Sequence, residues 1–359
     1  MHWSDRRLLE LFGIDLPIIA APMANFAGVD LAVAVAAAGG LGSLPCASIS
    51  PVRIREEVAT FRARSNKQVH LNFFCHAVEP SDPAKEQAWL DRIAPYYAEL
   101  GVAPPAVPLA GGHAPFGEPE CAAVEELRPD IVSFHFGLPR PELLARVRSA
   151  GCTILSSATS LREAVWLAER GVDAIIAQGA EAGGHRGMFH ETEVAMQMGT
   201  FGLVRAISDA VPVPVIAAGG IADGNGIAAA LVLGASAVQI GTAYLTCPES
   251  TISPLHRQAL ADPRRETAIT NVLTGRPARG VVNRFMREQG PIDRAAPAFQ
   301  RGRAAIAPLR AKAEAQGSAD FSPLWSGQGM LPACPIPAGE LTRDMAEQAL
   351  GRLKALARD

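Results

Sequence analysis

The sequence predicts an α/β fold, a (β/α)8 TIM barrel with a small helical subdomain over the carboxyl-terminal mouth of the barrel. Short apolar runs alternate with helical segments eight times within about the first 240 residues, and that count matches the barrel. The runs are almost wholly apolar, as expected for parallel strands buried on both faces. Polar residues and glycines gather where the runs end, which is where barrels carry their active sites. A doubly wound open sheet shares this local pattern, but eight units would make a long one.

The individual elements follow from apolar runs and from local start and stop signals. Helix starts are indicated at Ser50-Pro51, and a helix end at Gly39-Gly40. Residues 101–119 are rich in proline and glycine and are expected to form a connection. The expected strands are residues 17–23, 42–45, 69–74, 130–136, 153–158, 173–177, 214–218 and 237–241. The expected helices between them are residues 30–38, 51–64, 83–100, 141–150, 161–170, 201–210 and 227–233.

The pattern changes after Thr242. Residues 247–329 are rich in arginine, alanine and proline, with helical stretches and no clear strands. We therefore predict a barrel at residues 1–247, a helical subdomain on the substrate side at 248–325, and a carboxyl-terminal segment at 326–359. Within that last segment, residues 338–357 are amphipathic and predict a closing helix that packs back on the barrel.

Composition excludes several classes of function. Of 359 residues, 48% are hydrophobic and 19% charged, which indicates a globular chain. A formal net charge of −3 without basic runs gives no basis for nucleic-acid binding. We expect neither a membrane span nor a secretory leader. The cysteines are scattered without a CxxC pair, which argues against a zinc site or a disulfide framework and favours reduced thiols in a cytoplasmic protein. They are Cys46, Cys75, Cys121, Cys152, Cys247 and Cys334.

A glycine-rich segment, AQGAEAGGHRG at residues 177–187, follows the sixth expected strand. Packing does not explain it, because it has almost no apolar side chain to bury. Glycines let the backbone approach a flat ligand closely. His185 is the one side chain of this segment whose charge can change near neutral pH. We interpret the segment as part of an active site, with His185 as the candidate catalytic residue.

Glycine-containing turns also follow the last two expected strands, at the place where barrels bind phosphate. Backbone N–H groups and a hydroxyl surround the anion at such a place, near a helix amino terminus. Glycines in tight turns alone would look similar, but two such turns at these two strands favour a phosphate site. The turns comprise Gly219 and Gly220 after the seventh strand, and Gln239, Ile240, Gly241 and Thr242 after the eighth.

Two amides, Asn72 and Gln178, stand at the ends of the third and sixth expected strands. An amide both donates and accepts hydrogen bonds, which suits a heterocycle with carbonyl and N–H groups along one edge. Either amide alone could cap a loop. Together with a phosphate site across the same mouth, they suggest flavin mononucleotide (FMN). His135, between two phenylalanines in a strand, is either a core histidine or a group that faces the substrate.

Seven motifs occur in an order that resembles a known family. They are PIIAAPM at 17–23, GGLGS at 39–43, NFF at 72–74, VSFHFG at 132–137, AQGAEAGGHRG at 177–187, PVIAAGGIADG at 214–224 and GASAVQIGTAYL at 234–245. With them the chain resembles the class I nitronate monooxygenases, formerly called 2-nitropropane dioxygenases. The resemblance is strong over residues 14–245 and weaker through 270–280 and 324–328. Flavin-dependent enoyl-carrier-protein reductases and NADH:quinone reductases share similar motifs.

The resemblance implies FMN in the barrel mouth, no metal, and a nitronate of the propionate 3-nitronate type that reacts with O2. One-electron oxidation of the nitronate and addition of oxygen would give a carbonyl compound and nitrite. His185 would be the catalytic histidine, and His135 would face the substrate. The implied FMN-binding residues are Ala21, Pro22 and Met23 under the ring, Asn72 and Gln178 at its edge, and Gly183, Gly219, Gly220, Gln239, Ile240, Gly241 and Thr242 around the phosphate. A monomer or homodimer is expected.

The chemistry of the reaction allows two roles for His185. A nitronate is already a carbanion equivalent and needs a donor or cation near its nitro oxygens, which His185 or His135 can supply. A neutral nitroalkane would instead need a general base, and a pKa of His185 near the working pH would suit that.

One departure from the family pattern is Phe299, which stands where a pocket tyrosine is expected. Two other functions remain open. The chain could be an NAD(P)H-dependent flavin reductase of quinones or enoyl thioesters on the same barrel. It could also be a flavin binder without enzymatic activity, which a histidine in an otherwise apolar mouth makes the less favoured reading.

Overall fold

The computed structural model describes residues 3–191, 193–329, 331 and 335–357. Eight parallel strands form one sheet in the order β1-β9-β8-β6-β5-β4-β3-β2. A parallel bridge between Ile19 and Leu41 links β1 to the residues just before β2, so the sheet curls into a nearly closed barrel. This confirms the predicted (β/α)8 fold over the open doubly wound sheet.

Each barrel strand lies within its predicted run or extends one residue past it. The side chains are buried on both faces, because one face fills the barrel interior and the other packs under the helices. The strands are β1 (Ile18–Ala20), β2 (Ser43–Pro45), β3 (His70–Phe74), β4 (Ile131–His135), β5 (Thr153–Ala158), β6 (Ala174–Gln178), β8 (Val215–Ala218) and β9 (Ala237–Ile240).

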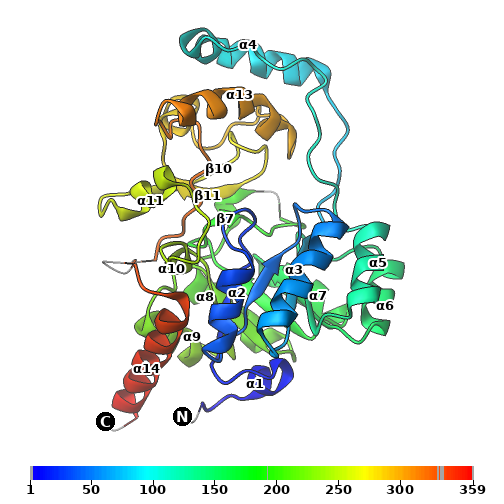
Figure 1. Cartoon of the computed structure of the whole chain (residues 1–359), viewed down its shortest axis with the longest axis vertical. Helices are drawn as coiled ribbons and strands as arrows, with labels where there is room; N and C mark the ends of the chain where they lie inside the picture. Colours follow the sequence, from blue (N-terminus) through cyan, green and yellow to red (C-terminus); the bar gives the residue numbers. More distant parts are fainter. Residues whose placement is uncertain (1–2, 192, 330, 332–334, 358–359) are drawn as a thin grey trace.

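Helices cover the outside of the barrel and build a second layer above its mouth (Figure 1). Local caps define several starts: the Ser50 hydroxyl, for example, accepts a hydrogen bond from the Arg53 N–H at 3.3 Å just before Pro51 begins a helix. The helices are α1 (Arg7–Phe12), α2 (Val29–Ala37), α3 (Pro51–Arg64), α4 (Pro83–Leu100), α5 (Glu118–Leu127), α6 (Pro141–Ser149), α7 (Leu161–Glu169), α8 (Thr200–Ala210), α9 (Gly224–Val232), α10 (Thr242–Leu245), α11 (Pro254–Ala261), α12 (Arg284–Gln289), α13 (Arg301–Ala315) and α14 (Ala338–Leu356), with a 3-10 turn at Val194–Met196.

The helix predicted at residues 83–100 exists as α4, but it does not cover the barrel. It lies at the far end of the molecule, over α13, on two long connections (Figure 1). The barrel position after β3 is taken by α5, which packs between α3 and α6 and begins inside the segment predicted to be a connection. Amphipathic spacing predicts a helix but does not say which partner its apolar face will meet.

The expectation that residues 247–329 lack strands is wrong. Strands β10 (Thr267–Thr270) and β11 (Ala278–Val281) pair antiparallel, and β11 also pairs with β7 (Gly184–His185) from the glycine-rich segment. Four-residue and two-residue strands carry too short a pattern to be recognised, and only their mutual pairing makes them a sheet. The pairing of β7 with β11 places His185 next to the carboxyl-terminal half of the chain.

We call α4, β10, β11 and helices α11–α13 the cap. The cap has its own hydrophobic core, in which Trp89, Ile93 and Tyr97 of α4 pack with Phe285 and Leu309. The Tyr97 hydroxyl donates to the Ala305 carbonyl of α13. A division of the chain at residue 247 remains a prediction, and this core draws residues from both sides of it.

The carboxyl-terminal helix α14 lies against α2 and α9 on the outside of the barrel. Its Thr342 hydroxyl is 2.7 Å from the Tyr244 hydroxyl, so the helix is joined to α10 by a buried hydrogen bond. In the part of the chain that the structure describes, no helix has the length and apolar character needed to cross a bilayer. Cys334 lies outside the described residues, and the other cysteines are unpaired.

Candidate active site in the barrel mouth

A cavity of about 690 Å³ opens at the carboxyl-terminal ends of the barrel strands and is roofed by the cap. Its floor is made of strand ends and of the turns that follow them, and its roof includes α13 and the loop around Trp325. This volume falls in the range of small-molecule and cofactor sites. We call it the mouth cavity.

All but one of the predicted site residues line the mouth cavity. The exception is Ile240, whose side chain is wholly buried in the barrel core, while its carbonyl accepts a hydrogen bond from the Ala21 N–H at 2.8 Å. The residues that do line it are Ala21, Pro22, Met23, Asn72, His135, Gln178, Gly183, His185, Gly219, Gly220, Gln239, Gly241 and Thr242.

The glycine turn after β8 forms a crowded cradle. Gly219 has a φ of +119°, and a Cβ added there would lie 2.8 Å from the Thr200 hydroxyl and 2.9 Å from the Ala182 nitrogen. Gly220 also has a positive φ, +73°. No described residue accepts a hydrogen bond from either backbone N–H. Only glycine fits this turn, and its two N–H groups are available to a ligand.

The opposite side of the cradle is equally tight. A Cβ on Gly183 would lie 2.5 Å from the backbone nitrogen of Gly327, which itself donates to the Thr242 hydroxyl at 2.8 Å. The Thr242 hydroxyl proton is therefore free to point elsewhere. The side-chain oxygen of Gln239 and the Ser48 hydroxyl are buried next to the cavity without a hydrogen-bond partner among the described residues. Unpartnered buried polar atoms of this kind call for a ligand.

An amide side chain contains both a donor and an acceptor, but each of these two amides has only one of them left for the cavity. Asn72 donates to the hydroxyl of Ser133 at 2.8 Å and to its carbonyl at 3.3 Å, so both amide protons are used and its oxygen is left for the cavity. Gln178 accepts from the Gly187 N–H at 2.7 Å and donates to the His185 carbonyl at 3.0 Å, which leaves one N–H. Asn72 thus offers an acceptor and Gln178 a donor.

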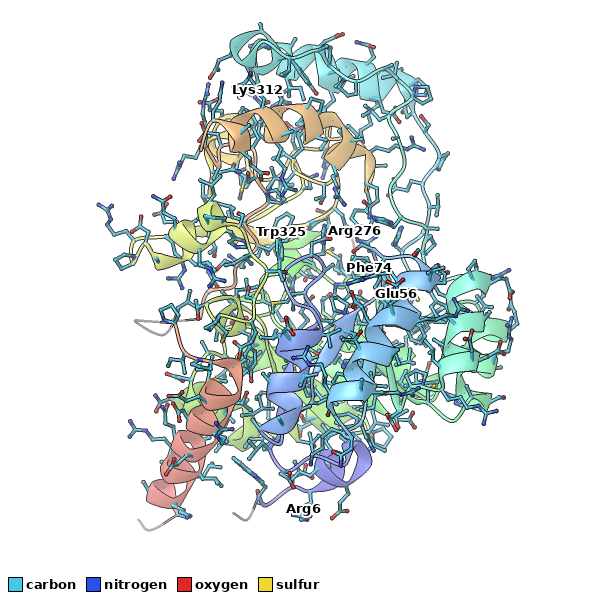
Figure 2. The ribbon with its side chains drawn as sticks, in the orientation of Figure 1. Arg6, Glu56, Phe74, Arg276, Lys312 and Trp325 are labelled. Carbon is cyan, nitrogen blue, oxygen red and sulfur yellow. The ribbon has the colours of Figure 1, made fainter. Side chains whose placement is uncertain are left out.

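His185 is surrounded by aromatic rings. Phe299, just before α13, and Trp325, in the loop after α13, lie with ring centroids 5.2 and 5.3 Å from the imidazole, and Phe74 of β3 lies 6.5 Å away. Phe299, the departure from the expected tyrosine, therefore does face the site, but as an apolar ring. Figure 2 shows Phe74 and Trp325 at the level where the barrel meets the cap.

The proton on His185 depends on Thr274. The Thr274 hydroxyl oxygen is 3.0 Å from His185 Nε2 and 3.2 Å from the Arg276 carbonyl oxygen. When the hydroxyl donates to that carbonyl, it accepts from Nε2–H, and Nδ1 of His185 is an acceptor. When it donates to Nε2, Nδ1 carries the proton. Nδ1 has no partner among the described residues, so His185 can offer the cavity either a donor or an acceptor.

The environment of His185 keeps it neutral. Burial, reinforced by the positive charge of Arg276, lowers the pKa of His185 to about 3. This finding contradicts the expectation that His185 titrates near the working pH. A neutral imidazole can donate or accept one hydrogen bond at Nδ1, but it is not the cation that the sequence also allowed.

His135 is occupied by protein partners on both sides of its ring. Its Nδ1 is 2.6 Å from the Ser157 hydroxyl, and its Nε2 is 3.1 Å from the carbonyl oxygen of His185. Because a carbonyl only accepts, Nε2 carries the proton and Nδ1 accepts from Ser157. Burial lowers the pKa of His135 to about 3. His135 lines the cavity, but its ring nitrogens hold the His185 backbone, and contact with a substrate remains a prediction.

Two buried arginines, which the sequence analysis did not single out, hold the loop between β6 and β7. Arg186 is fully buried and donates to the carbonyls of Gln178 and Gly179 at 2.6 and 2.7 Å. Arg279 of β11 donates to the Ala180 carbonyl at 2.7 Å. The only sequence signal for Arg186 was its place in the glycine-rich segment.

A third arginine, Arg276, packs against an aromatic ring near the site. The guanidinium of Arg276 is 4.0 Å from the ring centroid of Phe136 and donates to the Met188 carbonyl. Burial lowers its pKa to about 10, so it stays charged at neutral pH. It is labelled in Figure 2 between the barrel and the cap. Only the weak resemblance of residues 270–280 drew attention to it.

Comparison with known proteins agrees with this geometry. The family model described as nitronate monooxygenase matches residues 5–348. The chain is similar to nitronate monooxygenases of Paraburkholderia phytofirmans, at 42% identity over 99% of this chain and 98% of the relative, and of Pseudomonas aeruginosa, at 42% identity over 96% and 99%.

Solved structures share the fold over nearly the whole length. Nitroalkane oxidase from Streptomyces ansochromogenes has a TM-score of 0.88 at 35% identity, covering 98% of this chain and 99% of its own. FabK from Thermotoga maritima has a TM-score of 0.74 at 25% identity, covering 99% of both chains. From the match to the family model and from both relatives, the chain belongs to the nitronate monooxygenase family of oxidoreductases.

Proposed function

We propose that this protein is an FMN-dependent nitronate monooxygenase that oxidises alkyl nitronates of the propionate 3-nitronate type with O2 to a carbonyl compound and nitrite. The observation that carries the proposal is the mouth cavity itself, in a chain of this family. It combines a glycine cradle for a phosphate at one end with a neutral histidine among aromatic rings at the other.

The residues present fit FMN. The N–H groups of Gly219 and Gly220 and the Thr242 hydroxyl supply donors for a phosphate. The oxygen of Asn72 and the remaining N–H of Gln178 match N–H and carbonyl groups along the edge of a flavin ring. The unpartnered oxygen of Gln239 supplies a further acceptor.

Bound FMN would supply the electron acceptance that the oxidation of a nitronate requires. The chain's own part is to hold and orient the substrate. With Nδ1 protonated, His185 donates a hydrogen bond to a nitro oxygen, and Phe299 and Trp325 keep water away from that contact. Because its pKa is lowered to about 3, His185 is a weak base, which suits it to orienting a nitronate better than to deprotonating a nitroalkane.

A positive group suits the carboxylate of propionate 3-nitronate. Arg303 of α13 lines the mouth cavity and forms no ion pair with an acidic side chain among the described residues. We expect Arg303→Met to raise KM for propionate 3-nitronate about tenfold, since a charge-assisted hydrogen bond is lost, and to leave KM for neutral ethyl nitronate unchanged. Equal changes for both substrates would remove Arg303 from substrate recognition.

A second function, NAD(P)H-dependent reduction of quinones or enoyl thioesters, is favoured by one observation. The mouth cavity extends along α13 past Arg303 to Ala307, Arg310 and Ala311, which leaves room for a substrate longer than a small nitronate.

One pair of measurements decides between the two functions. The purified protein is first reconstituted with FMN and its absorption spectrum recorded. It is then assayed aerobically with propionate 3-nitronate for nitrite, and mixed anaerobically with NADH. Nitrite release with slow bleaching by NADH supports the monooxygenase. Fast bleaching by NADH without nitrite release supports the reductase, and a protein that takes up no FMN contradicts both.

A further inference from the structure

A chain of buried polar groups runs through the barrel interior to the mouth cavity. The hydroxyl of Ser43 lies 2.6 Å from the Ala20 carbonyl oxygen and 2.7 Å from Nδ1 of His70. Nε2 of His70 lies 2.7 Å from the Ser133 hydroxyl, which in turn accepts from Asn72 at 2.8 Å. Ser43, His70 and Ser133 are almost completely buried, and none of them lines the cavity.

The direction of every hydrogen bond in this row of polar groups follows from the two carbonyl groups at its ends, those of Ala20 and Ser133. The carbonyl of Ser133 can only accept, so the amide group of Asn72 turns its nitrogen toward Ser133. The Ser133 hydroxyl, having accepted from Asn72, donates to Nε2 of His70. Nδ1 of His70 then carries the proton and donates to Ser43, whose own proton goes to the Ala20 carbonyl. Each donated proton in this row of groups therefore has an acceptor, and each acceptor has a donor.

His70 must be neutral for this order to hold. A second proton on Nε2 would place two donors, from His70 and Asn72, against the Ser133 hydroxyl and leave its own proton without an acceptor. Complete burial lowers the pKa of His70 to about 3, which agrees with this geometry. These hydrogen bonds therefore keep the same directions at every pH at which the protein is assayed.

We propose that His70 is a positioning residue for the cofactor site. Through Ser133 it locks the amide of Asn72 so that the oxygen, and not the N–H, faces the mouth cavity, and the site thereby selects a cofactor that presents an N–H group there. The inference rests on the proposed FMN site. Oxidised FMN has one ring N–H, at N3, so 3-methyl-FMN is the matching probe that lacks it.

The experiment measures dissociation constants of FMN and 3-methyl-FMN for the wild type, Asn72→Ala, Ser133→Ala and the double variant. Ser133→Ala removes the shorter of the two hydrogen bonds that orient the amide, at 2.8 Å, and leaves the longer one, to the Ser133 carbonyl at 3.3 Å. We expect it to weaken FMN binding about threefold to tenfold and to reduce the preference for FMN over 3-methyl-FMN, because one neutral hydrogen bond is lost. In the Asn72→Ala background the same change has no further effect, because His70 and Ser133 act only through Asn72.

Two more variants test the role of His70 and guard against simple loss of structure. His70→Phe is expected to match Ser133→Ala, while His70→Gln, whose amide both donates and accepts, restores at least part of the preference for FMN. The matched control is Ser156→Ala on β5: its buried hydroxyl bonds only to the carbonyls of Phe134 and Gly137, and it keeps wild-type binding. If His70→Phe does not fold, Ser133→Ala decides.

The inference is overturned if folded Ser133→Ala keeps the wild-type dissociation constant and the wild-type preference for FMN. It is also overturned if Ser133→Ala weakens binding equally with and without Asn72, since that marks a general effect on the barrel. A wild-type protein that binds no FMN at all contradicts the proposed function, and this inference with it. If the wild type binds FMN and the variants bind it with the same dissociation constants, this inference is wrong but the proposed function is not contradicted.

Discussion

At the scale of single residues, the site works through groups that do not change charge. Burial holds His70, His135 and His185 in their neutral forms, and each ring is oriented by hydrogen bonds whose directions are set by backbone carbonyls or hydroxyls. Selectivity in the mouth cavity thus depends on where donors and acceptors point. Two substitutions test this view.

The first prediction concerns the glycine cradle. Gly219→Ala would place a Cβ 2.8 Å from the Thr200 hydroxyl at a φ of +119°. We expect FMN binding to weaken at least tenfold and stability to fall by about 2 kcal/mol, because the turn must open. Equilibrium dialysis and urea unfolding measure the two effects. Gly351→Ala on α14 is the control, since a Cβ there would meet nothing within 4 Å and the residue does not line the mouth cavity.

The second prediction concerns the partner of His185. Thr274→Val keeps the shape of the side chain but removes the hydroxyl that sets the proton on Nε2. We expect kcat/KM for a nitronate to fall about tenfold with FMN affinity unchanged, and Thr274→Ser to retain activity. In pH profiles with preformed nitronate, the wild type should show no inflection between pH 6 and 7. An inflection there that disappears in His185→Asn would contradict the neutral imidazole.

At the scale of elements, the β6–β7 segment owes its position to long-range pairing. β7 pairs with β11 of the cap, and Arg186 and Arg279 hold the carbonyls of residues 178–180 from two sides. A glycine-rich segment has little side-chain packing of its own to order it. The cap therefore does more than cover the cavity: it fixes the backbone that carries Gln178 and His185.

The third prediction belongs to this element. Arg186→Met removes the guanidinium donor from the Gln178 carbonyl and one of two donors from the Gly179 carbonyl, which also accepts from the Ala182 N–H at 3.0 Å. We expect a loss of about 3 kcal/mol in unfolding free energy and a proportionate loss of FMN, because unsatisfied buried groups are costly. Urea unfolding gives the first value and the flavin absorbance of the purified protein the second. Arg205→Met, which removes only an exposed ion pair with Asp209, should change stability by less than about 0.5 kcal/mol.

At the scale of the whole molecule, the neutral histidines make the fold sensitive to acid. The pKa values of His70, His135 and His185 are lowered to about 3 by burial, against an ordinary value of 6.5. Between those two values the unfolded chain binds more protons than the folded one. Stability therefore falls as pH decreases from about 6.5, and carboxylates with lowered pKa values, such as Asp5 at about 2, add their effect only at lower pH.

The fourth prediction puts a size on this effect. From pH 7 to pH 5 each of the three histidines should remove about 2 kcal/mol of unfolding free energy. His76 and His256, whose pKa values burial lowers to about 4, add to the loss. Urea unfolding at pH 7, 6 and 5 measures the slope. In His70→Gln, if it folds, the loss over this range should be smaller by about 2 kcal/mol. A stability that is constant over this range would show that the histidines titrate in the folded protein.

Local patterns in the sequence were enough to predict the barrel and most of the residues around its mouth. Strand ends such as Asn72, Gln178 and Gly219 could be assigned because a parallel (β/α)8 sheet brings all its carboxyl ends to one rim. Apolar runs and helix caps are local signals, and their consequence for the fold does not depend on distant contacts. Resemblance over the seven motifs pointed to the same rim.

Which groups face that rim, and in which protonation state, depends on contacts that form only in the folded chain. The pairing of β7 with β11, the transfer of α4 to the cap and the burial of Ile240 depend on contacts between segments far apart in the chain. The pKa of His185 depends on burial under Phe299 and Trp325, which no local pattern reports. Strands and glycine turns follow from near neighbours in sequence, whereas desolvation and hydrogen-bond direction follow from near neighbours in space.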